Sequence, residues 1–379
     1  MKQSNKFLWV GGIFDEKTVK NFPSISPAAN FWQRGFAESL KQHGNSVDVI
    51  GHPVERVWPF GRLSIGSAQA DLPQGFEGKP VGYVNAPFLR GPIQYVNYLR
   101  AAKAHVRETG MKPDYVVTYS CINRANDWTP TAAAAKSLRK RFGAPWICVV
   151  GDGIAPPGAD GYIYNTWGYF DDSSSPSPKM FLDGGVPLVG SEQSLNFIPA
   201  LKRKVLMFMG ALTPHAGVSW LARAFHSIQD EAIELWISGR GENEELRLLA
   251  EIDKRIKLIG FVSEKELNEL AAQVSVFVNP RPSDFEPNKL NYPSKLLHYF
   301  AYEKPVISTL TPGVSPDYEA VLIPVREETE ACLADTIRST LNLSEEEFEA
   351  ACARIKEFNA THSWVFQVKR FTTWLETRK

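Results

Sequence analysis

The chain has 379 residues, of which 44% are hydrophobic, a length and composition that favour two packed globular domains. Its 42 basic and 42 acidic residues cancel, so nucleic acid is not expected as the main partner. No apolar run reaches about 18 residues, and the first residues lead directly into a strand, so neither a membrane-spanning helix nor a signal peptide is predicted. The four cysteines lack metal-ligand spacing and are expected to be reduced, mostly buried thiols of a cytoplasmic protein.

The first half of the chain alternates buried strands with helices. A strand at 7–10 is followed by a helix that begins at Ser26–Pro27 and by a second strand at 47–50. A strand, a helix and a strand in this order form a βαβ unit with a parallel sheet. Further strands are expected in this half at 115–117, 146–150 and 162–164.

The second half repeats the same alternation. The turn-rich stretch Asp183–Pro187 indicates an interdomain linker, and a new series of strands starts after Lys204. Strands are expected at 205–210, 235–238, 256–261, 274–278 and 306–308.

Two capping boxes and one apolar stripe mark the later helices. Ser263 with Glu266, and Ser344 with Glu347, have the spacing in which a serine and a glutamate bond reciprocally at a helix start. The last helix is expected to pack through one apolar face, which consists of Trp364, Val368, Phe371 and Leu375.

The segment 292–300 combines a helix start with a cation. Pro293 suits the first position of a helix, and Ser294 and Lys295 stand on its first turn. A helix N-terminus has unpaired N–H groups and the positive end of the helix dipole, so with an added lysine it attracts a phosphate. By spacing alone, an ordinary surface lysine on an α/β connection is an equally good interpretation.

This segment resembles the one with which GT-B glycosyltransferases grip the diphosphate of a nucleotide-sugar donor. The pattern is nearest to the bacterial xanthan glucuronosyltransferase type and to other polysaccharide-synthesis transferases. Glycine-containing loops after the expected strands, at 210–217, 239–242 and 260–263, add to the resemblance, because ligands of such folds bind at the carboxyl ends of strands. The resemblance implies an α/β protein of GT-B class, with two Rossmann-like domains whose parallel sheets face each other across a cleft.

The resemblance also implies a division of the chain. Residues 1–186 would form an acceptor-binding domain and residues 187–355 a nucleotide-sugar-binding domain. Residues 356–379 would form a C-terminal helix that crosses back to the first domain.

The donor-binding residues follow from the same resemblance. The backbone at Phe261 and Val262 would bind the base, Ser294 and Lys295 the diphosphate, and His298 the ribose or a phosphate. Arg281 would line the nucleotide pocket, and Gly210 and Arg240 belong to the donor loops. A half-buried helix histidine is the alternative for His298, and a solvated loop arginine is the alternative for Arg281.

Two departures from the family pattern bear on the mechanism. Typical retaining enzymes of this fold carry an arginine and a lysine where Ala211 and Ala216 stand here. They also carry two glutamates at the places of Leu290 and His298. The common retaining machinery is therefore absent, and Lys295 is expected to supply most of the charge that faces the phosphates.

On the acceptor side, Asp152 follows the strand 146–150 and resembles the proposed base of the xanthan-type enzyme. It would accept the proton of the attacking hydroxyl in an inverting displacement, a step that general bases accelerate by about 10²–10⁴-fold. The alternative is a carboxylate that only closes a turn or caps the next segment. Gly12, Asn30 and Gly153 are further acceptor-side candidates, and no metal or cofactor is expected, because the nucleotide sugar is a substrate.

The sequence thus predicts a cytoplasmic transferase that moves a sugar, from a UDP-sugar by preference, to a glycan or lipid-linked acceptor of bacterial surface polysaccharide synthesis. Aromatic loops at 57–60 and 86–92, with the basic helix at 136–141, could meet the membrane surface, although packing within the loops and a solvated basic face is the simpler interpretation. The alternatives are a retaining transferase or sugar-nucleotide epimerase on the same fold, and a degenerate protein that binds nucleotide sugars without catalysis. A dehydrogenase is disfavoured, because no Gly-x-Gly-x-x-Gly follows the first strand.

Overall fold

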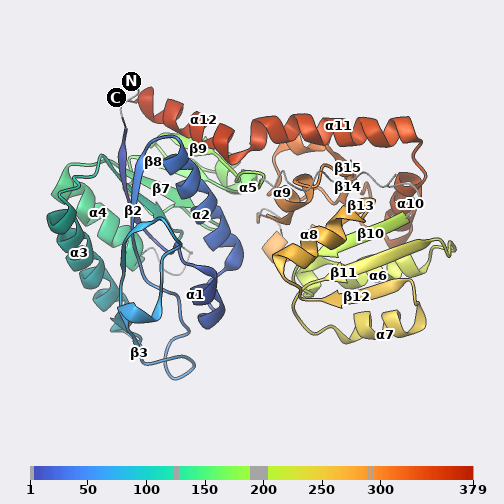
Figure 1. The fold of residues 1–379 in the computed structure, drawn as a ribbon, viewed down its shortest axis with the longest axis horizontal. Coiled ribbons are helices and arrows are strands. Elements are labelled where there is room, and N and C mark those ends of the chain that lie inside the picture. The colour runs from blue at the N-terminus through green and yellow to red at the C-terminus, as the bar shows by residue number, and fades with distance from the viewer. Residues whose placement is uncertain (1–3, 123–127, 188–203, 289, 292–293, 379) are drawn as a thin grey trace. The chain divides into compact units, whose positions relative to one another are not determined.

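The computed structural model describes residues 4–122, 128–187, 204–288, 290–291 and 294–378. The chain forms two compact units, shown in Figure 1. The first consists of residues 1–185 and 367–379, and the second of residues 186–366. Tyr292 and Pro293, which the sequence places at the start of the phosphate segment, lie outside the described residues.

The first unit is built on a parallel seven-stranded sheet in the order β4-β2-β1-β6-β7-β8-β9. The predicted strands of this half are all present, because runs of buried apolar residues can be covered on both faces of a parallel sheet. The strands are β1 Lys6–Val10, β2 Ser46–Gly51, β4 Glu77–Pro80, β6 Tyr115–Tyr119, β7 Trp146–Val150, β8 Gly161–Tyr164 and β9 Lys179–Phe181. A separate antiparallel pair joins β3 Ser64–Ile65 to β5 Tyr83–Val84.

Helices pack against this sheet. They are α1 Glu16–Asn21, α2 Pro27–Gln42, α3 Arg90–Thr109, α4 Pro130–Phe142, α5 Trp167–Asp171 and, from Gln367 onward, α12 Trp364–Glu376. Helix α2 begins as the sequence predicts, with the Ser26 hydroxyl accepting a bond from the Ala29 N–H at 3.3 Å. In α12 the ring of Phe371 lies 5.0 Å from that of Phe36 and 6.1 Å from that of Phe7, so the last helix completes the core of this unit.

The second unit has a parallel six-stranded sheet in the order β12-β11-β10-β13-β14-β15. Its strands are β10 Lys204–Met209, β11 Ile233–Ser238, β12 Ile256–Gly260, β13 Val276–Asn279, β14 Val306–Ser308 and β15 Leu322–Pro324. Its helices are α6 Val218–His226, α7 Glu244–Ile252, α8 Glu264–Ala272, α9 Lys295–Phe300, α10 Glu330–Leu341 and α11 Glu345–His362. Both predicted capping boxes are present, at Ser263 and at Ser344.

One expected boundary differs from the structure. The sequence places residues 356–366 in the segment that returns to the first domain, but they belong to the second unit. The reason is that α11 buries Ile355 and Phe358 in the apolar core of that unit, where the Phe358 ring lies 5.3 Å from that of Phe300. Of the predicted crossing segment 356–379, only the residues from Gln367 onward belong to the first unit.

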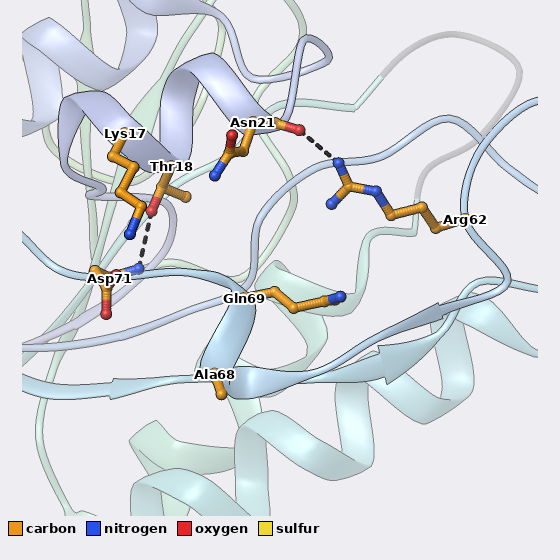
Figure 2. Close-up of a pocket in the computed structure, with 7 residues that line it drawn as sticks. All are labelled: Lys17, Thr18, Asn21, Arg62, Ala68, Gln69 and Asp71. Carbon is orange, nitrogen blue, oxygen red and sulfur yellow. Dashed lines mark hydrogen bonds between the residues drawn. The ribbon is translucent and has the colours of Figure 1, made fainter.

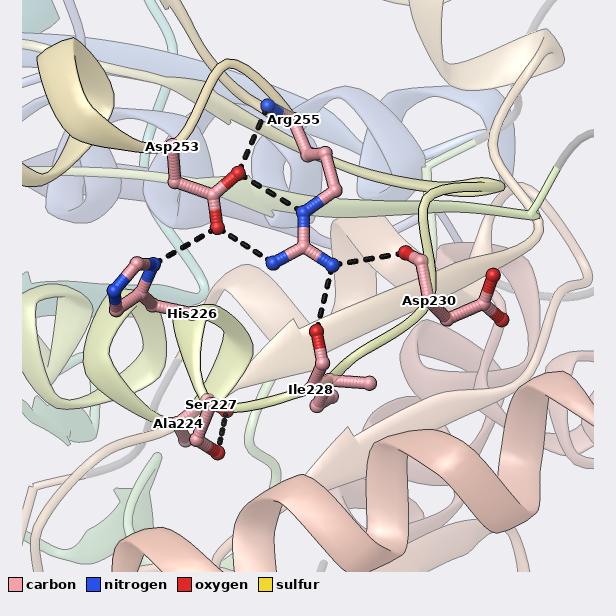
Figure 3. A network of polar contacts seen from close by, with 7 residues as sticks. All are labelled: Ala224, His226, Ser227, Ile228, Asp230, Asp253 and Arg255. Atoms are coloured by element: carbon pink, nitrogen blue, oxygen red, sulfur yellow. Dashed lines mark hydrogen bonds and ion pairs between the residues drawn. The ribbon is translucent and has the colours of Figure 1, made fainter.

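A polar cluster ties the ends of two helices of the second unit to β12 (Figure 3). The Arg255 guanidinium donates to both carboxylate oxygens of Asp253, at 2.9 and 2.6 Å, and to the carbonyls of Ile228 and Asp230. His226 contacts the same carboxylate at 3.0 Å. The bonds from Arg255 hold the pKa of Asp253 well below its usual range. The carboxylate therefore stays charged at neutral pH and keeps its contacts with Arg255 and His226.

Candidate functional site

Loops from neighbouring strands of the second unit form one layer at the carboxyl edge of its sheet. The Gly210 N–H donates to the Ser238 carbonyl at 2.9 Å, and the Leu212 N–H donates to the Arg240 carbonyl at 2.8 Å. A Cβ added at Gly239 would overlap the Gly210 carbonyl oxygen. The loops at 210–217 and 239–242 are therefore in direct backbone contact, which only a glycine at position 239 permits.

Gly210 and Lys295, both predicted to bind the donor, lie together at this edge. The Lys295 Nζ lies 4.2 Å from the centroid of the Phe208 ring. A Cβ added at Gly210 would lie only 2.7 Å from that Nζ, and Gly210 has a φ of +149°. The positive φ is the reason why glycine suits this position, and the absence of a side chain leaves room for the end of Lys295.

The positive charge of Arg281 acts on two further basic side chains at this place, Lys295 and His215. Burial, followed by the positive charge of Arg281, lowers the pKa of Lys295 from 10.5 to about 7. Burial lowers the pKa of His215 as well, with smaller contributions from Arg281 and Lys295. Desolvated like charges of this kind favour an anion among them and mark candidate functional sites. The sequence does not single out His215 as a site residue.

Hydrogen bonds hold the loops that carry His215 and Arg281. Asn288, which is fully buried, donates through its Nδ2 to the His215 carbonyl at 2.8 Å and to the Pro282 carbonyl at 2.7 Å. The Thr309 hydroxyl donates to the Arg281 carbonyl at 2.5 Å. The two loops are therefore connected, which keeps the basic groups together before any ligand arrives.

Helix α9 positions Lys295 from the other side. The buried Tyr299 hydroxyl accepts from the Met209 N–H at 3.0 Å and donates to the Met209 carbonyl at 3.1 Å, and its ring stacks on Phe277 at 4.9 Å. Ser294 stands at the N-cap position, is exposed and makes no side-chain capping bond. His298 is half-buried, and burial lowers its pKa. Since α9 has only six residues, the charge of Lys295 contributes more here than the helix dipole.

Arg240 and Phe261 form a second contact at the same edge. The Arg240 guanidinium carbon lies 3.7 Å from the centroid of the Phe261 ring, which is largely exposed. Val262, beside it, is half-buried. This contact presents a flat polar and aromatic surface next to the layer of loops.

In the first unit, Asp152 is held in a tight turn after β7. The Gly153 N–H donates to the Gly151 carbonyl at 2.8 Å, and the Asp152 side chain is exposed. A Cβ at Gly151 would lie 2.9 Å from the Tyr119 hydroxyl, and one at Gly153 would lie 2.8 Å from the Cβ of Cys121. The two glycines therefore let the turn lie directly on its neighbours.

A tyrosine and an asparagine that the sequence did not single out lie beside this turn. Asn165 Nδ2 donates to the Tyr119 hydroxyl at 3.1 Å. Burial, followed by the negative charge of Asp152, raises the pKa of Tyr119, so the hydroxyl stays protonated at neutral pH.

Gly12 and Asn30 hold the loop that follows β1. Asn30 Nδ2 donates to the Phe14 carbonyl at 3.0 Å, and its Oδ1 accepts from the Phe14 N–H at 2.9 Å. A Cβ at Gly12 would lie 3.1 Å from the Phe14 ring. These contacts fix the loop, and a role of either residue toward an acceptor stays a prediction.

A pocket of about 240 Å³ lies elsewhere in the first unit (Figure 2). Its lining contains none of the predicted site residues and consists of Lys17, Thr18, Asn21, Arg62, Ala68, Gln69 and Asp71. Arg62 donates to the Asn21 carbonyl at 2.7 Å, and the Asp71 N–H donates to the Thr18 hydroxyl at 2.9 Å. Within the described part of the chain, no group of three or more His, Cys, Asp or Glu side chains is placed to hold a metal ion.

The sequence model of a family described as "Glycosyl transferases group 1" matches residues 203–342. That stretch contains the loop layer, His215, Arg281 and Lys295. Among curated proteins, none matches the chain significantly. None of the described helices has the length and apolar character needed to cross a membrane.

Solved structures resemble the chain over nearly its whole length. Sucrose-phosphate synthase from Thermosynechococcus elongatus is 14% identical with a TM-score of 0.65, and 98% of each chain is covered. A glycosyltransferase from Rickettsia africae is 12% identical with a TM-score of 0.67, covering 98% of this chain and 97% of the other. HepE from Anabaena, in complex with UDP-glucose, is 11% identical with a TM-score of 0.62, covering 98% and 99%. These similarities and the two parallel sheets confirm the predicted class, an α/β protein of GT-B fold.

Proposed function

We propose that the protein is a glycosyltransferase that transfers a sugar from a nucleotide-diphosphate donor to a glycan or lipid-linked acceptor, and that this donor is a UDP-sugar. The observation that carries the proposal is the cluster of Lys295, Arg281 and His215 above Gly210, within the stretch that the family model matches. A diphosphate would bring negative charge to a place where burial and like charge lower the pKa values of Lys295 and His215, and it would favour their protonated forms. The complex of the structurally similar HepE with UDP-glucose favours uridine as the base.

The residues divide the work of binding. Lys295 and Arg281 take the diphosphate, and the backbone beyond Gly210 approaches it closely because that position has no side chain. The base lies against the surface formed by Arg240, Phe261 and Val262. Ser294 and His298 contribute polar groups to the phosphates and the ribose. In this scheme Arg281 supplies a positive charge in place of the basic residues that typical retaining enzymes carry at the positions of Ala211 and Ala216.

Transfer would proceed by an inverting displacement without a metal ion. The acceptor hydroxyl oxygen attacks the anomeric carbon, the bond from that carbon to the phosphate oxygen breaks, and the nucleoside diphosphate leaves with the electron pair. Asp152 takes the hydroxyl proton, and its exposed side chain on a rigid turn suits that task. The reaction would belong to surface polysaccharide synthesis on the cytoplasmic face of the bacterial membrane.

Calorimetric titration with UDP and with uridine tests the donor site. Replacement of Lys295 by Met keeps the aliphatic stem and removes the charge. The variant should lose about 1.5–3 kcal/mol of binding free energy for UDP and almost none for uridine. Lys265→Met, an exposed lysine of α8, is the matched control and should bind both as the wild type does. Equal losses for UDP and uridine would remove Lys295 from the phosphate site.

A retaining transferase or an epimerase on the same fold is the second candidate, and a non-catalytic binding protein is the third. The anomeric configuration of the product, read by NMR, separates inverting from retaining transfer. Hydrolysis of UDP-sugar in the absence of an acceptor excludes the non-catalytic protein.

A further inference from the structure

The first unit carries a cluster of exposed apolar side chains on two loops. The larger members, called here the aromatic loop surface, are Trp58, Phe60, Leu63, Phe88 and Leu89. Phe88 is 97% exposed and Phe60 is 83% exposed. A ring with that exposure has no walls around it, so these rings protrude and do not line a groove.

One buried asparagine holds the two loops side by side. Asn85 is fully buried, and its Nδ2 donates to the carbonyls of Arg56 and Arg62, at 2.5 and 2.8 Å. Its backbone N–H donates to the Leu63 carbonyl at 2.7 Å, and its carbonyl accepts from the Trp58 N–H at 3.1 Å. The rings therefore stand on a fixed base and belong to one surface, beside the β3–β5 pair, which lies in the part of the first unit far from α12 (Figure 1).

Phe88 has an unusual backbone conformation. Its φ is +62°, in the left-handed region that a bulky residue adopts only with strain. Strain of this kind persists where the surroundings impose it and gathers at functional places. Phe88 lies just before α3. The Arg90 N–H donates to the Ala86 carbonyl at 3.0 Å, so the start of the helix fixes the turn that contains Phe88.

The two loops carry more basic than acidic side chains. The two loops and the start of α3 carry Arg56, Arg62 and Arg90, together with one acid, Glu55. The Glu55 side chain is buried, accepts from the Arg56 N–H at 2.9 Å and lies 3.5 Å from the Arg62 Nε. The acid thus points inward and pairs with Arg62, so Arg56 and Arg90 supply the net positive charge near the rings. Arg62 also donates to the Asn21 carbonyl at 2.7 Å and lies over the Phe22 ring at 4.4 Å. In the basic helix α4, Arg139 is engaged in a similar way, with Asp160 and with the Gly158 carbonyl.

We infer that the aromatic loop surface inserts into the interface of a bilayer that contains anionic phospholipid. Protruding aromatic and leucine side chains fit a fluid interface, and bordering arginines fit acidic headgroups. The first of these loops follows β2 and Asp152 follows β7, both at the carboxyl edge of one parallel sheet. The inference rests on the proposed function in one respect: it makes the acceptor a lipid-linked one, presented at the membrane to that edge.

Sedimentation with vesicles tests the inference on the full chain. The variant Phe60→Ser/Phe88→Asn removes both rings, and asparagine tolerates the positive φ at position 88. Its partition onto vesicles of phosphatidylglycerol and phosphatidylcholine should fall by about 10-fold for each ring, hence about 100-fold for both. Ile252→Ser, which removes another side chain that is 72% exposed, is the matched control and should partition as the wild type does.

The outcomes separate this inference from the proposed function. Wild-type binding to anionic vesicles that weakens on pure phosphatidylcholine and disappears in the double variant supports the surface. No wild-type binding, or equal binding of the double variant, overturns it and leaves a protein partner as the occupant to seek. UDP titration of the same samples is the second readout, because the double variant should bind UDP normally. Failure of the wild type to bind UDP, with vesicle binding intact, would contradict the donor site and not this surface.

Discussion

Replacement of Lys295 by Met should make the ligand-free protein more stable while it weakens the donor site. The pKa of Lys295 is lowered from 10.5 to about 7, chiefly by burial, so the folded protein holds this proton less tightly than the unfolded chain does. The resulting destabilisation is absent above pH 10.5, grows as the pH falls, and is complete below about pH 7. One pKa unit corresponds to about 1.4 kcal/mol. Lys295 therefore lowers the free energy of unfolding by on the order of 4 kcal/mol at pH 7 and on the order of 2 kcal/mol at pH 9.

Thermal unfolding at these two pH values measures the effect. The Lys295→Met variant should melt above the wild type at pH 7, and the difference should shrink at pH 9. Lys265→Met supplies the control for the loss of a lysine as such. A variant that melts below the wild type at pH 7, or a difference that grows with pH, would refute the reasoning that Lys295 is held at a cost for the sake of an anion.

The same proton provides further tests. UDP binding should raise the pKa of Lys295, so titrations at pH 8 in buffers of different ionisation enthalpy should show uptake of close to one proton, and the Lys295→Met variant should show none. Asp152→Asn should bind UDP-sugar normally and lose at least about 10²-fold in turnover, whereas near wild-type turnover would assign the base elsewhere. Gly239→Ala should abolish UDP binding, because the new methyl group overlaps the Gly210 carbonyl; unchanged affinity would mean that the loop layer is not the site. Asp253→Asn should lower the stability of the second unit by about 1–3 kcal/mol at neutral pH, and the difference from wild type should fade as the pH drops below about 4, where the unfolded carboxylate of the wild type gains its proton.

The fold could be predicted because its signals are local. Runs such as 146–150 are short, apolar and bounded by glycine or proline, which is typical of buried parallel strands. The capping boxes at Ser263 and Ser344 are read from a serine and a glutamate three residues apart. The start of the segment that joins the first unit could not be predicted from local signals. It depends on which of the two cores buries Ile355 and Phe358, and the periodicity of a helix does not identify the core against which it packs.

The position of a candidate site residue could be predicted only where that residue stands in a motif. Gly210 and Lys295 belong to such motifs, and the structure brings them together. His215 carries no periodic signal, and its relation to Lys295 arises because a loop and the start of α9, which are far apart in the sequence, meet in the fold. Asn165 bonds to Tyr119 across 46 positions, and Asn85 holds loops whose sequence shows only that they are aromatic. Contacts of that kind come from tertiary packing, which a single sequence does not display.

The discontinuity of the first unit has a consequence for the order of events during synthesis. Its sheet is made from the first 185 residues, yet Phe371 and Trp374 complete its core, and the Trp374 ring lies where a side chain at Gly161 would stand. While the ribosome makes the chain, the apolar face formed by Phe7 and Phe36 cannot be covered by Phe371 until the whole second unit has been synthesised. The second unit can close its own core earlier, although it is encoded later, and the last thirteen residues act as the closing step for the first.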